Sequence, residues 1–166
     1  MRKGHIFVYY GEGKGKTSLA VGQGMRAIGE ELRVVMIQYM DYNHTKEMIP
    51  LKKLEPDFRI FRFEKIRTSF DEADEGMKKE ISTEVKNAFN FTKKIMDTGE
   101  CDMLILDGIF DAVEREYISE HELSDALSKR PSYMDVITTG THRSKLVADQ
   151  ADFVYRICTE KTICEE

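Results

Sequence analysis

One stretch rich in glycine and lysine, residues 11–18 (GEGKGKTS), constrains the fold of this chain more than any other segment. An apolar run at 5–10 precedes it, and small and apolar residues with helical spacing follow at 17–28. A glycine-rich turn between a strand and a helix is typical of the first unit of an α/β fold. Each of the three glycines can take positive φ and turn its amide inward, and the helix adds its positive dipole end. We therefore expect an anion-binding nest here.

The same stretch is close to the phosphate-binding P-loop pattern G-x-x-x-x-G-K-[ST]. The sequence Gly15-Lys16-Thr17 supplies the second half of the pattern, while Tyr10 stands in place of the first glycine. Lys16 is predicted to neutralise phosphate oxygens, and Thr17 to place its hydroxyl on Mg²⁺. The alternative is a strand-to-helix turn that binds no ligand. The predicted cradle consists of Gly11, Glu12, Gly13, Lys14, Gly15, Lys16, Thr17 and Ser18.

Short apolar runs alternate with helical stretches along the rest of the chain. We expect strands at 5–10, 32–39, 58–63, 102–107, 134–139 and 153–158, and helices at 17–28, 72–97, 119–129 and 144–150. This alternation predicts a three-layer α/β/α, P-loop NTPase-like domain with a mostly parallel sheet. The run at 58–63 alternates apolar and charged residues, which favours an edge strand. The length of 166 residues predicts one domain, 1–166.

Polar features follow three of the predicted strands, where ligands bind in parallel sheets. The first is the glycine-rich turn itself. The second is Asp107, which ends the run DMLILD as the acidic residue of a Walker B strand does, and which could hold Mg²⁺. The alternative is that Asp107 only caps the turn at Gly108. The third feature is Thr139-Gly140. Because parallel strands end at one edge of the sheet, all three are expected there together.

Charge and cysteine content exclude several other classes of protein. The net charge of −5 does not favour general binding to nucleic acid or to anionic lipid, so a polyanion site has to be local. The apolar run at 5–10 is too short for a signal peptide or a membrane span. Three scattered cysteines without a C-x-x-C pair predict neither a disulfide framework nor a zinc site. A cytoplasmic protein with reduced thiols is therefore expected.

With these residues in place, the chain resembles the ATP:corrinoid adenosyltransferases of the P-loop class. That family has the loop G-x-G-K-G-K-T-[ST] and also lacks the first P-loop glycine. The resemblance runs through most of the chain in the same order. The other matching pieces are Met25 to Gly29, Val34 to Met40, Asp102 to Asp107, Lys129 to Pro131, Thr138 to Gly140 and Ala151 to Val154.

The resemblance implies that a reduced Co(I) corrinoid attacks the 5′ carbon of ATP and that triphosphate leaves. ATP with Mg²⁺ would be bound, a reductase could be a partner, and the chain would form a homodimer. Lys16 and Thr17 would be catalytic, and Thr17 with Asp107 would hold the metal. The competing hypothesis is a divergent P-loop ATP-binding or ATPase module that has lost corrinoid adenosylation. Beyond the cradle, the implied nucleotide-binding residues are Arg26, Gln38, Thr139, Gly140 and Arg143.

The sequence departs from the family at two charged positions. The family's metal-binding strand ends Asp-Glu, whereas this chain has Asp107-Gly108, and Asp111 is a candidate replacement for the glutamate. The family's Thr-Gly-Arg places an arginine near the triphosphate, whereas Thr141 follows Gly140 here. Arg143 either reaches back to that place or is an ordinary solvated charge.

The aromatic wall of the family's corrin site is also reduced, since this chain contains no tryptophan. Phe70 is the nearest candidate, and Phe61 and Phe63 are better interpreted as core residues. The stretch 39–53 follows a strand end and is expected to be a loop that meets substrate. The family's C-terminal extension is reduced here to 160–166.

Overall fold

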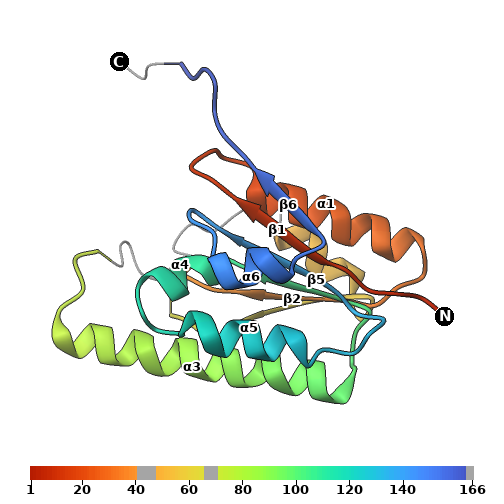
Figure 1. Cartoon of the computed structure of the whole chain (residues 1–166), viewed down its shortest axis with the longest axis horizontal. Helices are drawn as coiled ribbons and strands as arrows, with labels where there is room; N and C mark the ends of the chain where they lie inside the picture. Colours follow the sequence, from red (N-terminus) through yellow and green to blue (C-terminus); the bar gives the residue numbers. More distant parts are fainter. Residues whose placement is uncertain (41–47, 66–70, 164–166) are drawn as a thin grey trace.

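A computed structural model describes residues 1–40, 48–65 and 71–163, and six parallel strands in these residues form one sheet. The order across the sheet is β3-β2-β4-β5-β1-β6. Figure 1 labels β2, β5, β1 and β6 among these strands. All six predicted strands are present. Their bounds are β1 (Ile6–Tyr10), β2 (Val34–Gln38), β3 (Phe58–Arg62), β4 (Met103–Asp107), β5 (Asp135–Gly140) and β6 (Phe153–Arg156).

The four predicted helices are confirmed as α1 (Lys16–Gly29), α3 (Glu75–Thr98), α5 (Glu120–Ser128) and α6 (Lys145–Gln150). Sequence analysis missed three short elements, namely α2 (Met48–Leu51), the 3₁₀ helix η1 (Lys52–Leu54) and α4 (Ile109–Glu114). Each is at most two turns long, so its apolar residues show no helical period. The stretch 48–54, expected to be loop, is therefore helical, while 41–47 lies outside the described residues.

Helices cover both faces of the sheet, because each central strand is apolar on both sides. In β1, Ile6 and Val8 pack in the core shared with α3, α4, α5 and α6. The alternate residue Tyr9 packs instead in the core that α1 and α2 form on the opposite face. Figure 1 shows α1 on one side of the sheet and α3 with α5 on the other. This arrangement is the three-layer α/β/α fold that the sequence predicts.

Local signals fix the ends of the long helices. Ser119 caps α5, and its side chain accepts from the Glu122 amide at 3.1 Å while Glu122 Oε2 accepts from the Ser119 amide at 3.1 Å. These hydrogen bonds lower the pKa of Glu122 below its usual range. Gly99 ends α3 with a left-handed φ of 63°. No helix of the described residues is long and apolar enough to cross a lipid bilayer.

The strand order decides what surrounds the glycine-rich loop. β3 is an edge strand, as its alternating sequence predicts, and β6 is the other edge. β1 lies inside the sheet, parallel to β5 on one side and to β6 on the other. The loop after β1 therefore has the segments after β5 and β6 as neighbours.

Phe61 and Phe63, at β3, pack against Phe91 of α3, with ring centroids 4.7 and 5.3 Å apart. Phe70 lies outside the described residues.

Candidate nucleotide-binding site

The glycine-rich loop between β1 and α1 differs from the predicted nest in how its amides are used. Gly11 and Gly15 have positive φ, at 129° and 105°, but Gly13 does not. The Gly11 amide donates to the carbonyl oxygens of Gly140 and Thr141, at 3.2 and 2.9 Å. The Gly13 amide donates to Ile157 O at 3.1 Å. The expectation that all three glycine amides turn inward is therefore wrong for Gly11 and Gly13.

Positions 11 and 13 require glycine because another part of the backbone lies against them. A Cβ on Gly11 would stand 2.1 Å from Ile157 O, and one on Gly13 would stand 2.9 Å from the Cys158 backbone. The Ile157 amide in turn donates to Tyr10 O at 2.7 Å. The chain that leaves β6 therefore packs along the loop and holds its shape, which explains two glycines that sequence analysis assigned to the ligand.

Lys16, the first residue of α1, lies across this loop. Its Nζ donates to Gly11 O at 2.6 Å and to Gly13 O at 2.8 Å. An ammonium group has three protons, so one donor remains for a ligand oxygen. The first-turn amides of α1 point to the same place, because the first amides of a helix have no intrahelical partner. A fixed cation beside helical amides is an arrangement suited to phosphate.

A buried cluster of one carboxylate and two hydroxyls lies next to the loop. Asp107, at the end of β4, is only 6% exposed. The Thr17 hydroxyl lies 3.1 and 2.9 Å from its two carboxylate oxygens, and the Thr139 hydroxyl donates to Oδ1 at 2.7 Å. Gly108 is the N-cap of α4 and no side chain caps this helix, so the alternative in which Asp107 caps the helix is wrong.

The donor set of this cluster fits Mg²⁺. Mg²⁺ prefers oxygen ligands and is usually held by one or two carboxylates together with phosphates and waters. Asp107 offers the carboxylate, and Thr17 keeps lone pairs free because its proton points to Asp107. The described residues contain no group of three or more His, Cys, Asp or Glu that could hold a metal ion. The site therefore fits a cation that also takes ligands from a bound phosphate.

Thr139 was predicted to contact the nucleotide, but its side chain is occupied within the protein. It is 2% exposed, donates to Asp107, and accepts from the Gly108 amide at 2.8 Å. Thr139 thus orients the carboxylate rather than facing a ligand. The adjacent Gly140 has a packing role, since a Cβ there would stand 2.4 Å from Phe110 Cβ in α4.

We expect Thr139→Val to destabilise the protein by about 1–3 kcal/mol, because the half-buried Gly108 amide loses its acceptor. The same change should raise the Mg²⁺ concentration needed for tight ATP binding, since Asp107 loses its orienting donor. Thr139→Ser keeps the hydroxyl and should restore the Mg²⁺ dependence. Urea unfolding and calorimetric ATP titrations at graded Mg²⁺ measure both effects. An equal Mg²⁺ requirement in the valine and serine variants would contradict this role.

Asp111, the candidate replacement for the family's glutamate, is also engaged elsewhere. Its Oδ1 accepts from the Thr141 amide at 2.9 Å, so it supports the turn after β5. Gly108 takes a φ of 78°, and a Cβ there would stand 2.2 Å from Tyr39 O. The described residues therefore offer Asp107 as the carboxylate of this cluster, and Asp111 does not join it.

The remaining predicted site residues divide into two groups. Gln38 ends β2, is 5% exposed, and pairs in register with Asp107, so it lies at the same sheet edge. Glu12 and Lys14 are exposed on the loop, and their contacts with a nucleotide stay predictions. Arg26 is exposed on α1, ten residues beyond Lys16, which is about 15 Å along the helix. Arg26 is therefore not brought to the loop.

Arg26 and Ser18 line a groove of about 890 Å³ that runs between α1 and β6. The floor of this groove is aromatic, with Phe7 stacked on Phe153 at 4.9 Å between ring centroids. It lies on the α1 face of the sheet rather than over the strand ends. Ser18 thus lines this groove, and its contact with a nucleotide stays a prediction.

Arg143, the last candidate, contacts an aromatic ring and makes no ion pair with a carboxylate of the described residues. It is exposed, and its guanidinium carbon lies 5.7 Å from the centroid of the Tyr10 ring. Tyr10 directly precedes the glycine-rich loop, so Arg143 is held beside it. Of the two interpretations left open by the sequence, the geometry favours the one in which Arg143 reaches back.

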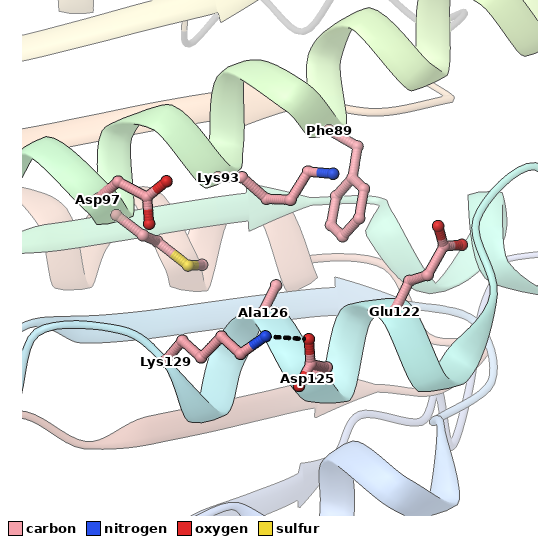
Figure 2. A pocket seen from close by; sticks show the side chains of 8 residues that line it. Phe89, Lys93, Asp97, Glu122, Asp125, Ala126 and Lys129 are labelled. Carbon is pink, nitrogen blue, oxygen red and sulfur yellow. Dashed lines mark hydrogen bonds and ion pairs between the residues drawn. The ribbon is translucent and has the colours of Figure 1, made fainter.

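Two further hollows of the described residues help to locate the site. One, of about 410 Å³, opens beside the Asp107 cluster, at the segments that follow β2, β4 and β5; its lining includes Met40, Asp111, Glu114, Thr141 and His142. The other, of about 260 Å³, lies between α3 and α5, far from the strand ends (Figure 2). Its charges are neutralised locally, as in the 2.6 Å pair of Lys129 and Asp125. Only the first hollow borders the site.

Comparison with known proteins assigns the chain to a family. The family model described as ATP:corrinoid adenosyltransferase BtuR/CobO/CobP matches residues 2–166. The corrinoid adenosyltransferase of Escherichia coli K12 is 28% identical over 152 residues, which is 92% of this chain and 75% of that protein. The corrinoid adenosyltransferase CobA of Salmonella typhimurium is 31% identical over 153 residues, with the same coverage of 92% and 75%. An uncharacterised Nostoc protein is 26% identical over 90% of this chain and 42% of its own length.

The matched region contains the loop with Lys16, the Asp107 strand end and the Thr139-Gly140 turn. These are the parts that the fold brings to one edge of the sheet. The identities of 28–31% agree with a divergent member of the family. This chain therefore belongs to the ATP:corrinoid adenosyltransferase family and is a transferase.

Proposed function

We propose that this protein transfers the adenosyl group of ATP to the cobalt of a reduced Co(I) corrinoid and releases triphosphate. The observation that carries the proposal is the pairing of Lys16 on its loop with the Thr17–Asp107 cluster, in a chain of this family. The first group suits a polyphosphate and the second suits its Mg²⁺. ATP, with its charged tail bound there, would present its 5′ carbon above the strand ends.

The reaction requires little acid–base catalysis by the protein. The Co(I) electron pair forms a cobalt–carbon bond at the 5′ carbon, the carbon–oxygen bond breaks, and triphosphate leaves with the electron pair of that carbon–oxygen bond. Cobalt is formally oxidised to Co(III) while it gains the alkyl group. The protein contributes by aligning the two substrates and by stabilising negative charge on the leaving group. Lys16, the first-turn amides and Arg143 are suited to the second task.

Mg²⁺ would neutralise phosphate oxygens when it is bound, held by Thr17 and Asp107. Gln38 lies beside Asp107 at the sheet edge, and we propose that it contacts the nucleotide. We propose that the corrinoid approaches over the hollow at Met40, Asp111 and His142, because segments after three of the same strands form it. His142 is tied there to Glu114, with 3.1 Å between Nδ1 and the carboxylate.

The remaining parts of the proposal concern partners. A Co(I) substrate needs an electron donor, so we propose an external reductase as the redox partner. We also propose that the protein acts as a homodimer in the cytoplasm, where ATP is abundant and thiols stay reduced. Light scattering of the purified protein tests the dimer.

Identification of the product from ATP tests the function. The protein is mixed with ATP, Mg²⁺ and chemically reduced cobalamin, and the visible spectrum is followed while the phosphate products are separated. The expected result is loss of the Co(I) spectrum with triphosphate in equal amount. ADP and phosphate without a spectral change would overturn the proposal and favour an ATPase. Lys16→Ala serves as the matched control for background alkylation.

A further inference from the structure

Tyr10, which stands in place of the first P-loop glycine, contacts Arg143 in the segment that follows β5. Tyr10 ends β1, and its ring carries the Arg143 guanidinium 5.7 Å from the ring centroid. Tyr10 is half-buried and packs against the main core, so its ring has a fixed position. Within the described residues, Arg143 makes no hydrogen bond and no ion pair to a carboxylate. All five guanidinium N–H donors remain available.

The backbone around Arg143 is held on both sides. Thr141 O accepts from the Gly11 amide at 2.9 Å, and the Thr141 amide donates to Asp111 Oδ1 at 2.9 Å. On the other side, Ser144 is 6% exposed and its hydroxyl donates to Glu120 Oε1 at 2.6 Å. The backbone on either side of Arg143 is therefore fixed, and only the direction of its exposed side chain can vary. The Tyr10 ring limits that direction.

We propose that Tyr10 is a positioning residue, whose ring holds the Arg143 guanidinium beside the glycine-rich loop so that it binds the triphosphate of ATP. This inference rests on the proposed function, since it assumes that the loop binds ATP. A guanidinium over a ring is attracted by the ring quadrupole and keeps its N–H fork exposed at the edge. That fork matches phosphate oxygens better than a freely rotating charge does. Arg143 is thus a second positioned cation beside the loop, in addition to Lys16.

The geometry also explains why an aromatic residue is tolerated before Gly11. A glycine at this position would offer Arg143 no surface on which to stack. Tyr10 keeps the backbone pairing of β1, where it lies in register with Gly140 and Arg156. Its ring is the surface at the end of the strand on which the Arg143 guanidinium stacks. A residue that looks like a defect in the P-loop pattern therefore has a function for the arginine that follows β5.

The experiment is a double-mutant cycle read by calorimetric binding of inorganic tripolyphosphate and of ATP. Arg143→Ala is expected to weaken binding roughly 10- to 100-fold, the size of a charged hydrogen bond. Tyr10→Leu, which removes the ring, is expected to weaken it about two- to fivefold. Tyr10→Phe keeps the ring and should bind as the parent does. In the Arg143→Ala background, Tyr10→Leu should have no further effect.

A second readout does not depend on ligand. Ring currents should shift the Arg143 δ-methylene protons upfield in NMR spectra of the parent and of Tyr10→Phe, and the shift should vanish in Tyr10→Leu. Thermal unfolding shows whether Tyr10→Leu also loosens the core. Lys94→Ala, which removes an exposed charge on α3, is the control for net charge and should bind as the parent does.

The outcomes separate this inference from the proposed function. If the parent binds neither ATP nor tripolyphosphate, both the proposed function and the positioning role of Tyr10 are refuted. If the parent binds and the Arg143→Ala variant binds equally tightly, only the positioning role of Tyr10 is refuted. If Tyr10→Leu weakens binding by the same factor with and without Arg143, the ring acts on the loop directly and the positioning role is refuted.

Discussion

Replacing Lys16 with alanine is expected to lower the rate of adenosyl transfer by roughly 10²–10³-fold, the loss typical of removing one preorganised group that stabilises developing charge. The effect should be large because two loop carbonyls already orient the ammonium, at 2.6 and 2.8 Å. No reorganisation is therefore needed when the leaving triphosphate gains charge. Single-turnover kinetics with Co(I) cobalamin measure the rate, and calorimetry measures the loss of ATP affinity.

Lys14→Ala is the matched comparison for this variant. Lys14 carries the same charge two residues earlier, but it is exposed and makes no hydrogen bond or ion pair in the described residues. A mobile, solvated charge stabilises little, so its loss should be far smaller than that of Lys16. If the two alanine variants lose activity equally, net charge rather than the oriented ammonium controls the rate, and the site geometry has been misinterpreted.

The second large effect is expected at Gly108, where Gly108→Glu would restore the carboxylate that the family carries. The structure predicts that this change disrupts the fold instead of improving metal binding. A non-glycine residue in the left-handed region costs roughly 1–2 kcal/mol. The new Cβ would also meet Tyr39 O at 2.2 Å, and overpacking of this kind costs roughly 1–3 kcal/mol more.

Tyr39 has little freedom to relieve this contact. It is 1% exposed, its amide donates to Asp107 O at 2.7 Å, and its hydroxyl lies 2.6 Å from Thr92 Oγ1. Burial also raises the pKa of the Tyr39 hydroxyl, which keeps it neutral. A loss of stability of roughly 2–5 kcal/mol is therefore expected, which thermal unfolding would report as about 2–4 °C for each kcal/mol.

Gly108→Ala separates strain from charge. It introduces the same Cβ without a carboxylate, so it should lose most of the same stability. A Gly108→Glu protein as stable as the parent, with a lower Mg²⁺ requirement, would show that the backbone at this turn adapts easily. The absent glutamate would then be a simple loss rather than a consequence of the turn.

Much of the architecture could be predicted from sequence, because the signals were local and periodic. Six apolar runs predicted six strands, and the rule that ligands bind at the carboxyl ends of parallel strands placed the loop, Asp107 and Thr139 together. The helices with clear caps, such as α5 at Ser119, were also predicted. The short helices α2 and α4 carry no such period, so they were missed.

The errors at the site have a different origin. Gly13 was assigned to the ligand because its neighbours in sequence suggest a nest, but its actual neighbour is Cys158 at the other end of the chain. The same holds for Thr139, whose hydroxyl serves Asp107 and Gly108. Sequence patterns indicate which residues reach an edge of the sheet. They do not indicate which polar atoms are already used there.

The insertion of β1 between β5 and β6 has a consequence for how this protein matures. The glycine-rich loop is translated before β5 and β6, yet its two carbonyl-bound amides find their acceptors at Gly140, Thr141 and Ile157. While the nascent chain is still on the ribosome, these acceptors have not been made, so the loop has no template to shape it. Affinity for ATP should arise late, in one step with the arrival of β6. Binding of nucleotide would then report that synthesis of the sheet is complete.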